Sequence, residues 1–494
     1  MPDTPRVPGE ACSPDEVIAG LRELLVQRDA QIAELAGQLE EQRALTAQLQ
    51  AQVADLAARI RQNSKNSSKP PSADGLAKPE PKSLRKKGAR KPGRPKGQPG
   101  ATMRLTDHPD DVIPHRPDRC RGCGHRLGQD AVQTGMERRQ VIDLPEEVQA
   151  KVAEHRMLEL ECPCCGERTQ ADAPAGVPAP VQYGPRAAAM ATYLWHGQFL
   201  SRDRACQALA DMFGCAPSPA VIAQAAKKIA AFISPALDAI VKGLLASGVA
   251  HSGETGFRAA GKLAWVHSAS AGNYVLVTVH PKRGTEGMDA AGILPSFAGI
   301  AVHDAWAPYD TYDGVAGHAL CNAHMLRELT AVTETGAELD VAWARQAIDA
   351  LLKLKKATDA ARAAGQDAID PDLLAAHAKD FTDAAGTGIV LNAARRSKLQ
   401  EKRHALATRM RDRAGDYLRF ARDLRVPFDN NDAERVIRMS KLRIKVSGCM
   451  RSMAGAETFC VIRSYLATAS RHGVGWLDAL IRAAEGDPWI PETA

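Results

Sequence analysis

The sequence predicts a multidomain α+β protein. Three observations support this fold class: a seven-residue apolar repeat near the N-terminus, two cysteine pairs between residues 120 and 165, and a change from helical to strand-like spacing near residue 247. The chain has 494 residues, which is enough for several domains with at least one sizeable core. We therefore expect several separately folded segments along the chain.

The apolar repeat predicts a coiled coil over residues 15–61. Leucine, isoleucine and valine recur at the seam positions of six heptads, and Arg28, Gln42 and Thr46 interrupt the seam. This spacing places an apolar stripe on one side of a helix, where a second helix can pack. We expect a homo-oligomer joined through this segment. The alternative is a long amphipathic helix that packs on its own chain.

The composition excludes a membrane partner and indicates a cytoplasmic protein. Hydrophobic residues make up 45% of the chain, and no apolar run reaches the 18 residues of a membrane span. The N-terminal stretch "MPDTPRVPGEACSPDE" lacks the basic and apolar regions of a secretory signal. The eleven cysteines are therefore expected to be reduced thiols or metal ligands rather than disulfides.

Residues 62–108 are predicted to form a disordered basic linker. Between residues 62 and 104, twelve lysines and arginines stand against two acidic residues, so the rest of the chain is slightly acidic. The stretch "GRPKG" places Arg94 and Lys96 around a proline, in an extended chain that suits a DNA minor groove and its phosphates. The alternative is a solvated basic spacer, whose charge would still favour nucleic acid.

Two cysteine knuckles predict a zinc-ribbon-like domain over residues 109–180. The zinc ligands are expected to be Cys120, Cys123, Cys162 and Cys165. Two C-x2-C turns present four thiolates to one tetrahedral ion, which leaves no open position and makes the zinc structural. Cys164 is a spare thiol that could compete as a ligand.

Helical spacing over residues 184–246 allows two interpretations. The turn "FGCAPSP" separates two predicted helices, as in a helix-turn-helix that reads DNA. The alternative is a helical spacer within a larger core.

The first part of an α/β core is predicted over residues 247–320. A hairpin within residues 249–270, a strand at 274–279, a short helix around 288–293 and a strand at 299–306 follow in order. Three antiparallel strands, a helix and a fourth strand begin a ribonuclease-H-like layer. Residues 321–424 form a predicted helical insertion, with breaks near "GQDAIDPD" and "AAGTGIV". The second part of the core, residues 425–482, begins with a helix around Asp432.

The ordered motifs of the chain resemble the transposases of insertion-sequence family sixty-six over nearly its whole length. These motifs are the coiled coil, "NSKNSSKPPSADG", the cysteine knuckles, "HSGETG…GKLAWVHSAS", "HPKRG", "VHDAWAPY", "HALCNAHMLREL", "PFDNNDAER" and "KVSGCMRS". The resemblance implies a ribonuclease-H-like catalytic core of the Asp-Asp-Glu type, whose third acid follows a helical insertion. Such a core holds two Mg²⁺ ions that cleave and join phosphodiesters.

Carried onto this chain, the second acid of the triad is Asp304 and the third is Glu434. The family's "H-x-D-E-T-G" segment is "HSGETG" here, so that the first-acid position is Gly253. Glu254 is the alternative ligand, although successive side chains of a strand point to opposite faces. Loss of one anionic ligand is expected to weaken metal binding and to impair catalysis without changing the fold.

Several smaller signals accompany the triad. Cys321 and His324 form a C-x-x-H element that could support the active site or contact DNA, or could simply pack on the sheet. The resemblance implies that Arg435 and Lys441 contact DNA phosphates, whereas helix capping and surface charge explain the same residues without a function. Asn430 or Asn431 could serve as the N-cap of this helix.

The resemblance implies a bacterial, nucleoid-associated enzyme that binds the ends of its mobile element and a target duplex. Small accessory transposition proteins are implied as partners. Two other classes of function compete with this one: a DNA-binding regulator or relic without catalysis, and a nuclease of the same fold that cleaves without joining.

Overall fold

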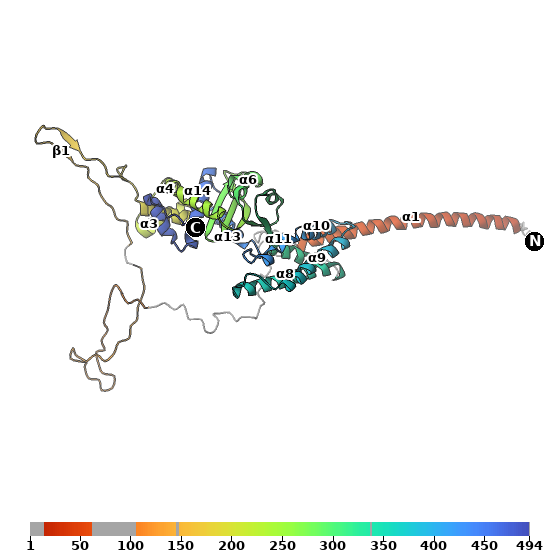
Figure 1. Cartoon of the computed structure of the whole chain (residues 1–494), viewed down its shortest axis with the longest axis horizontal. Helices are drawn as coiled ribbons and strands as arrows, with labels where there is room; N and C mark the ends of the chain where they lie inside the picture. Colours follow the sequence, from red (N-terminus) through yellow and green to blue (C-terminus); the bar gives the residue numbers. More distant parts are fainter. Residues whose placement is uncertain (1–13, 62–104, 145–147, 336–337, 494) are drawn as a thin grey trace, which may run out of the picture. The chain divides into compact units, whose positions relative to one another are not determined.

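The computed structural model describes residues 14–61, 105–144, 148–335 and 338–493 (Figure 1). Arg94, Lys96 and most of the predicted linker lie outside the described residues. The smaller of two compact units comprises residues 105–183 and 203–219, and the larger comprises the N-terminal helix, residues 184–202 and residues from 220 onward. Within the described ranges, no helix has both the length and the apolar character to cross a bilayer.

The helix predicted near the N-terminus is confirmed. Helix α1 (Pro14–Arg61) is continuous over 48 residues. Its apolar side chains are open to solvent, and Leu25 and Ile32 are each 62% exposed. An uncovered apolar stripe of this length is what a partner helix would bury. Coiled-coil pairing itself stays a prediction.

The smaller unit has little apolar core. Strands β1 (Glu159–Glu161) and β2 (Arg168–Gln170) form a two-stranded antiparallel sheet. The residues of both strands are exposed on both faces. Backbone hydrogen bonds, rather than apolar burial, therefore define the local structure here.

A five-stranded mixed sheet forms the centre of the larger unit, in the order β5-β4-β3-β6-β7. Its strands are β3 (Val249–Ala259), β4 (Lys262–Ala271), β5 (Tyr274–His280), β6 (Ile300–His303) and β7 (Gly317–Leu320). The first three are antiparallel, and β6 runs parallel to β3 and β7 parallel to β6. Ala260 and Gly261 form the two-residue turn of the β3–β4 hairpin, both with positive φ, as this turn type requires. The predicted order of three antiparallel strands, a helix and a fourth strand is confirmed.

Helices cover both faces of the sheet (Figure 1). Helices α13 (Asn431–Ser447) and α14 (Met453–Arg471) cover one face, where Phe257, Val266 and Phe459 share an apolar cluster. Helices α5 (Ser234–Leu245) and α6 (Thr285–Ala290) cover the other face, where Ile240 packs with Leu276. The alternating side chains of β3 therefore enter two different layers.

That residues 321–424 are an insertion into the core stays a prediction, but a helical bundle does separate β7 from α13. Its helices are α7 (Asn322–Thr333), α8 (Glu338–Ala363), α9 (Pro371–Leu391), α10 (Lys398–Asp412), α11 (Ala414–Tyr417) and α12 (Arg419–Arg422). The break predicted near "GQDAIDPD" is confirmed between α8 and α9. The break predicted near "AAGTGIV" is wrong, because α9 continues through this stretch. Its Gly388 allows close packing: a Cβ there would lie 2.9 Å from Trp343 and from Ala407.

The remaining described helices and helical turns are distributed over the two units. They are α2 (Pro185–Thr192), a π-helical turn (Tyr193–Gly197), α3 (Arg202–Phe213), α4 (Pro219–Phe232), α15 (Trp476–Glu485) and the 3₁₀ turns Leu294–Ser296 and Ala307–Thr311. The turn predicted at "FGCAPSP" lies between α3 and α4.

The packing of α9 predicts that alanine substitutions at two nearby glycines change the free energy of unfolding in opposite directions. Gly388→Ala is expected to lower the free energy of unfolding by about 1–3 kcal/mol, because the new methyl group overlaps two buried side chains. Gly386→Ala is the matched control on the same helix. A Cβ at Gly386 would meet nothing within 4 Å, so that alanine should stabilise the helix by about 0.5–1 kcal/mol. Urea unfolding monitored by circular dichroism measures both; equal effects would contradict the packing described.

Candidate active site

The register of two parallel strands places Gly253 and Asp304 at the same level of the sheet. Strands β3 and β6 pair Ala250 with Ala301 and His251 with Val302. Two further steps along both chains bring Gly253 opposite Asp304, just beyond the end of β6. A Cβ at Gly253 would lie 3.2 Å from the Cβ of Ala433. Position 253 therefore faces helix α13.

Asn430 ties the start of α13 to β3. Its side-chain Nδ2 donates to the Ser252 carbonyl over 2.7 Å, and its Oδ1 lies 2.9 Å from His251 Nδ1. The backbone N–H of Asn430 donates to Cys321 Sγ over 3.2 Å. Asn430 occupies the N-cap position, but its side chain makes no capping hydrogen bond to α13. It links the helix to the sheet instead, one turn before Glu434.

One carboxylate oxygen of Glu434 lies near a histidine and an arginine side chain. Its Oε1 lies 3.8 Å from His324 Nε2 and 3.7 Å from Arg327 Nη2. The same oxygen is buried and has no hydrogen-bond partner among the described residues. Glu434 therefore has an oxygen that is free to accept a further ligand.

The charge of Asp304 acts on His324, as that of Glu434 does. Burial is the largest influence on His324 and lowers its pKa, and Arg327 lowers it further, whereas the carboxylates of Glu434 and Asp304 both raise it. The pKa of the His324 imidazole is therefore influenced by both carboxylates. Asp304 is exposed, and it accepts the Trp306 backbone N–H over 3.3 Å. The intervening Ala305 has a φ of 67°, which turns the chain sharply after β6.

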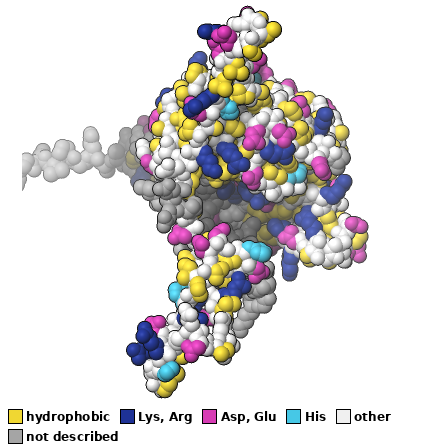
Figure 2. All heavy atoms as spheres, turned by 90° about the vertical axis from the view of Figure 1, so that its left-hand side faces the viewer, with side chains coloured by type: hydrophobic (Ala, Val, Ile, Leu, Met, Phe, Trp, Pro, Cys, Tyr) yellow, Lys and Arg dark blue, Asp and Glu magenta, His cyan; other side chains and the backbone are white. Residues whose placement is uncertain are grey.

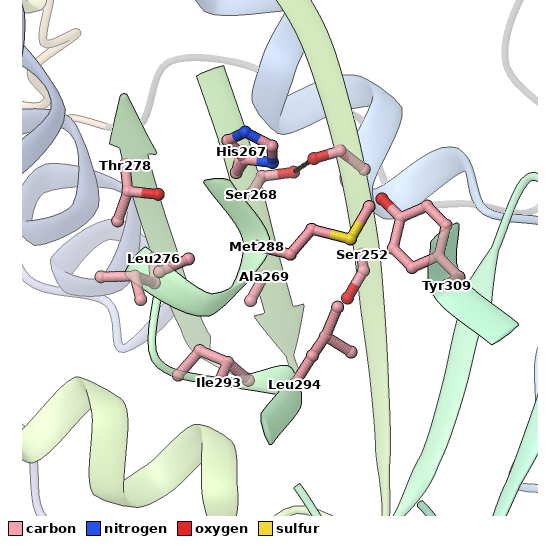
Figure 3. Close-up of a pocket in the computed structure, with 12 residues that line it drawn as sticks. Ser252, His267, Ser268, Ala269, Leu276, Thr278, Met288, Ile293, Leu294 and Tyr309 are labelled. Carbon is pink, nitrogen blue, oxygen red and sulfur yellow. Dashed lines mark hydrogen bonds between the residues drawn. The ribbon is translucent and has the colours of Figure 1, made fainter. Parts of the chain in front are cut away.

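Glu254 lies on the opposite face of β3 from Gly253 and is engaged there. Its side chain is 2% exposed, Arg283 donates to Oε1 over 2.8 Å, and the Tyr309 hydroxyl donates to Oε2 over 2.6 Å. Burial first, and the charge of Asp304 second, raise the pKa of Glu254. Figure 3 shows Tyr309 beside Ser252 and β3 on this face. Both oxygens of Glu254 therefore already have donors.

Arg283 is a site residue that the residue-by-residue reasoning missed. Its guanidinium lies 3.8 Å from the ring centre of Trp306 and 4.9 Å from that of Trp265. Together with Glu254 it connects β3 to the chain segment that follows Asp304. The motif "HPKRG" contained Arg283, but its partners became visible only in the fold.

Two groups of described side chains have metal-ligand geometry. They are Cys321, His324 and Glu434, and a second group of His303, Asp310 and His318; in each group the ligand atoms lie within 4.8 Å of one another. Burial raises the pKa of the Cys321 thiol to about 12, which disfavours its thiolate. His303 Nδ1 accepts the Ala305 N–H, and its Nε2 faces His318 Nδ1 at 3.1 Å. A neutral His303 then carries its proton on Nε2, which leaves no lone pair for a metal there.

The two cysteine knuckles form separately. Gly124 N–H donates to the Cys120 carbonyl, and Gly166 N–H donates to the Cys162 carbonyl, both over 2.9 Å. Hydrogen bonds from within each knuckle lower the pKa of its first cysteine, Cys120 or Cys162. Within the described ranges, the structure does not bring three of the thiols within 4.8 Å of one another. Zinc binding by Cys120, Cys123, Cys162 and Cys165 stays a prediction.

Basic side chains lie along α13. Arg435 is exposed and donates to the Asn431 carbonyl, and Lys441 is half-buried. On the face drawn in Figure 2, lysine and arginine side chains are interspersed with acidic ones. This face of the described residues is therefore less strongly basic than the linker sequence.

Residues 180–458 match the family model described as Transposase IS66 family. This match covers more than half of the 494 residues, so the chain belongs to the IS66 family of transposases. Residues 22–104 match a family of unknown function, DUF6444. No curated protein matches the chain.

The contacts of Asn430 predict a structural cost for its loss. Asn430→Ala should lower the free energy of unfolding by about 1–3 kcal/mol, because the buried groups of His251 and Ser252 lose their partner. Asn431→Ala, at the exposed neighbouring position, should change it by no more than about 0.5 kcal/mol. Chemical unfolding of the two variants beside the parent protein tests this difference. Equal losses would show that Asn430 does not anchor the helix.

Proposed function

We propose that this chain is an Asp-Asp-Glu-type DNA transposase that cleaves and joins strands at the ends of its mobile element, impaired because Gly253 occupies the first-acid position. The observation that carries this proposal is the register of β3 and β6. Extended two residues beyond its last pair, this register brings Gly253 level with Asp304, and Gly253 faces α13, the helix that carries Glu434.

The order of the strands supports a ribonuclease-H-like core. Three antiparallel strands are followed by two that are parallel to the first, in the order β5-β4-β3-β6-β7. The second acid follows the fourth strand, and the third acid lies on a helix after a long insertion. This is the arrangement that the family resemblance implies.

Asp304 and Glu434 are suitable ligands for Mg²⁺. Carboxylate oxygens are the donors that Mg²⁺ prefers, and Glu434 Oε1 has no hydrogen-bond partner among the described side chains. Bound Mg²⁺ activates the attacking hydroxyl and stabilises the leaving oxygen of a phosphodiester. The two acids would hold the ions, while Gly253 contributes no side-chain ligand. The site thus lacks one of the three carboxylates that would hold the metal pair.

Glu254 is a poor replacement for the missing acid. Its two oxygens accept from Arg283 and Tyr309, and its side chain lies in the layer opposite α13. Rotation toward α13 would leave the half-buried Arg283 side chain and the buried Tyr309 hydroxyl without their acceptor, which costs about 1–3 kcal/mol. We assign Glu254 a positioning role, in which it holds the segment after Asp304 through Tyr309.

The rest of the chain supplies DNA contact and assembly in this proposal. The basic linker with Arg94 and Lys96, the zinc-binding segment, and Arg435 with Lys441 on α13 would contact duplex DNA at element ends and target. The exposed apolar stripe of α1 would pair subunits, so that two element ends are held together. The C-x-x-H pair, Cys321 and His324, would support Glu434.

A second function is favoured by the same glycine. A chain that has lost one metal ligand could serve as a DNA-binding regulator without catalysis. Binding of element-end DNA without Mg²⁺-dependent cleavage would identify it. A nuclease of this fold would cleave but give no strand-transfer product.

Restoration of the first acid provides the direct test. Gly253→Asp is expected to raise Mg²⁺-dependent cleavage of element-end DNA by at least about 10- to 100-fold, because even outer-shell ligand losses cost that much. The new Cβ needs only a small shift, since it would lie 3.2 Å from the Ala433 Cβ.

The control variant is Gly253→Asn, which has nearly the same size and no charge. It should give no such gain, and Gly253→Asp combined with Glu434→Gln should lose it. Equal cleavage by the parent protein and Gly253→Asp would show that the first acid lies elsewhere. A gain with asparagine as large as with aspartate would exclude a ligand role for residue 253.

The zinc proposal predicts one zinc ion per chain. Cys120→Ser and Cys162→Ser should each abolish its retention, whereas Cys164→Ser should retain it, because only four thiolates complete a tetrahedral site. Metal content of the purified variants measures this. Retention of zinc by all three variants would contradict the assignment.

A further inference from the structure

A groove between α13 and α14 passes over β5, on the same sheet face as position 253. Its volume is about 170 Å³. Val277 comes from β5, Arg435 and Ser440 come from α13, and Arg463 and Arg471 come from α14. Three arginines thus line one small concavity that lies outside the group of Asp304 and Glu434.

Arg463 is buried without a counter-charge. The residue is 6% exposed, and its guanidinium lies 5.2 Å from the ring centre of Phe199 and 4.8 Å from that of Trp476. Its Nη1 is buried and has no hydrogen-bond partner among the described residues. Over the described ranges, no carboxylate lies within ion-pair distance of it. Burial lowers the pKa of Arg463 to about 10, so the group stays charged at neutral pH.

The surroundings of Arg463 add positive rather than negative charge. Arg443 is 4% exposed, and among the described residues it donates to the Gly448 carbonyl and, weakly, to Met450 sulfur. His196 is fully buried; burial first, and then the charges of Arg443 and Arg463, lower its pKa to about 3, so it is neutral. Within the described part of the protein, this region holds two buried guanidiniums and no acid that pairs with either. A buried charge of this kind is costly unless an anion from outside compensates it.

The other two arginines of the groove differ in the hydrogen bonds and ion pairs that they already make. Arg471 is engaged by Asp432, at 2.9 Å, and by the Gly272 carbonyl. Arg435 lies at the rim, with its side chain 71% exposed and 3.7 Å from Asp432. The guanidinium groups of Arg463 and Arg435 can therefore turn donors toward a ligand, while Arg471 adds its charge.

We propose that this groove binds a phosphate group, supplied by the backbone of bound DNA. Guanidinium donors match the oxygens of a phosphate, and the volume suffices for a group of that size. Phosphate binding by the groove does not depend on the proposed function; only the assignment of DNA as the source of the phosphate rests on it. In that setting the groove would fix a strand beside the helix that carries Glu434, and Arg463 would act as a binding residue.

The test measures phosphate binding by the full chain in a buffer without added Mg²⁺. Calorimetric titration with inorganic phosphate is made at constant ionic strength in chloride. The parent protein should bind phosphate. Arg463→Met, which retains an unbranched side chain between the two rings, should weaken binding at least about tenfold.

Arg435→Gln and Arg438→Gln form a matched pair on α13. Both side chains are exposed and both substitutions remove one charge, but only Arg435 lines the groove. Arg435→Gln should weaken phosphate binding several-fold, and Arg438→Gln should change it less than about twofold. This pair decides the question even where Arg463→Met does not fold.

A second arm identifies the source of the phosphate. Affinity for a short duplex is measured against salt concentration, where each phosphate contact contributes about 0.9 to the logarithmic slope. A slope reduced by about one in Arg463→Met supports a DNA phosphate. An unchanged slope with lost phosphate binding supports the groove as a site for free phosphate. No phosphate binding by the parent protein, or equal weakening by Arg435→Gln and Arg438→Gln, overturns the proposal. Neither result depends on whether Gly253→Asp cleaves DNA.

Discussion

The parallel pairing of β3 with β6 determines what the proposed active site can hold. Side chains alternate along β3, so one residue of register decides whether a side chain enters the layer of α13 or that of α6. The observed register ends at His251 and Val302; extended by two residues, it brings Gly253 level with Asp304, while Glu254 enters the other layer. A single glycine thus removes one carboxylate without disturbing the strand.

Contacts around this pairing keep the two remaining acids in place. Asn430 joins α13 to β3 one turn before Glu434, and Glu254 binds Arg283 and Tyr309, the latter within the segment that follows Asp304. These contacts do not require a side chain at position 253. A fold that retains them can lose a metal ligand and stay intact, which is why we place the effect of the glycine on chemistry rather than on stability.

Much of the fold could be predicted from the sequence, because long periodic segments and turn residues act locally. The N-terminal helix, the β3–β4 hairpin and the break before α9 are of this kind. The glycines near residue 388 misled the prediction, because glycine there permits close packing with Trp343 rather than ending the helix. Tertiary contacts also redirected the Asn430 side chain from capping to the sheet.

The partners within the site could not be predicted, because they join residues far apart in the chain. The stacking of Arg283 on two tryptophans and the uncompensated burial of Arg463 appear only when several elements pack together. Sequence reasoning could name acids and cysteines by their type and spacing. The importance of Arg463 comes from the lack of an acid beside it, and the sequence does not show which residues surround it.

The central claim is that residue 253, and not residue 254, faces the metal pair. Anomalous diffraction from crystals of the Gly253→Asp variant soaked in Mn²⁺ tests it most directly. The account predicts manganese bound by Asp304, Glu434 and the new aspartate, with Glu254 still bonded to Tyr309. Manganese coordinated by Glu254, or acids at positions 304 and 434 that share no ion, would contradict it.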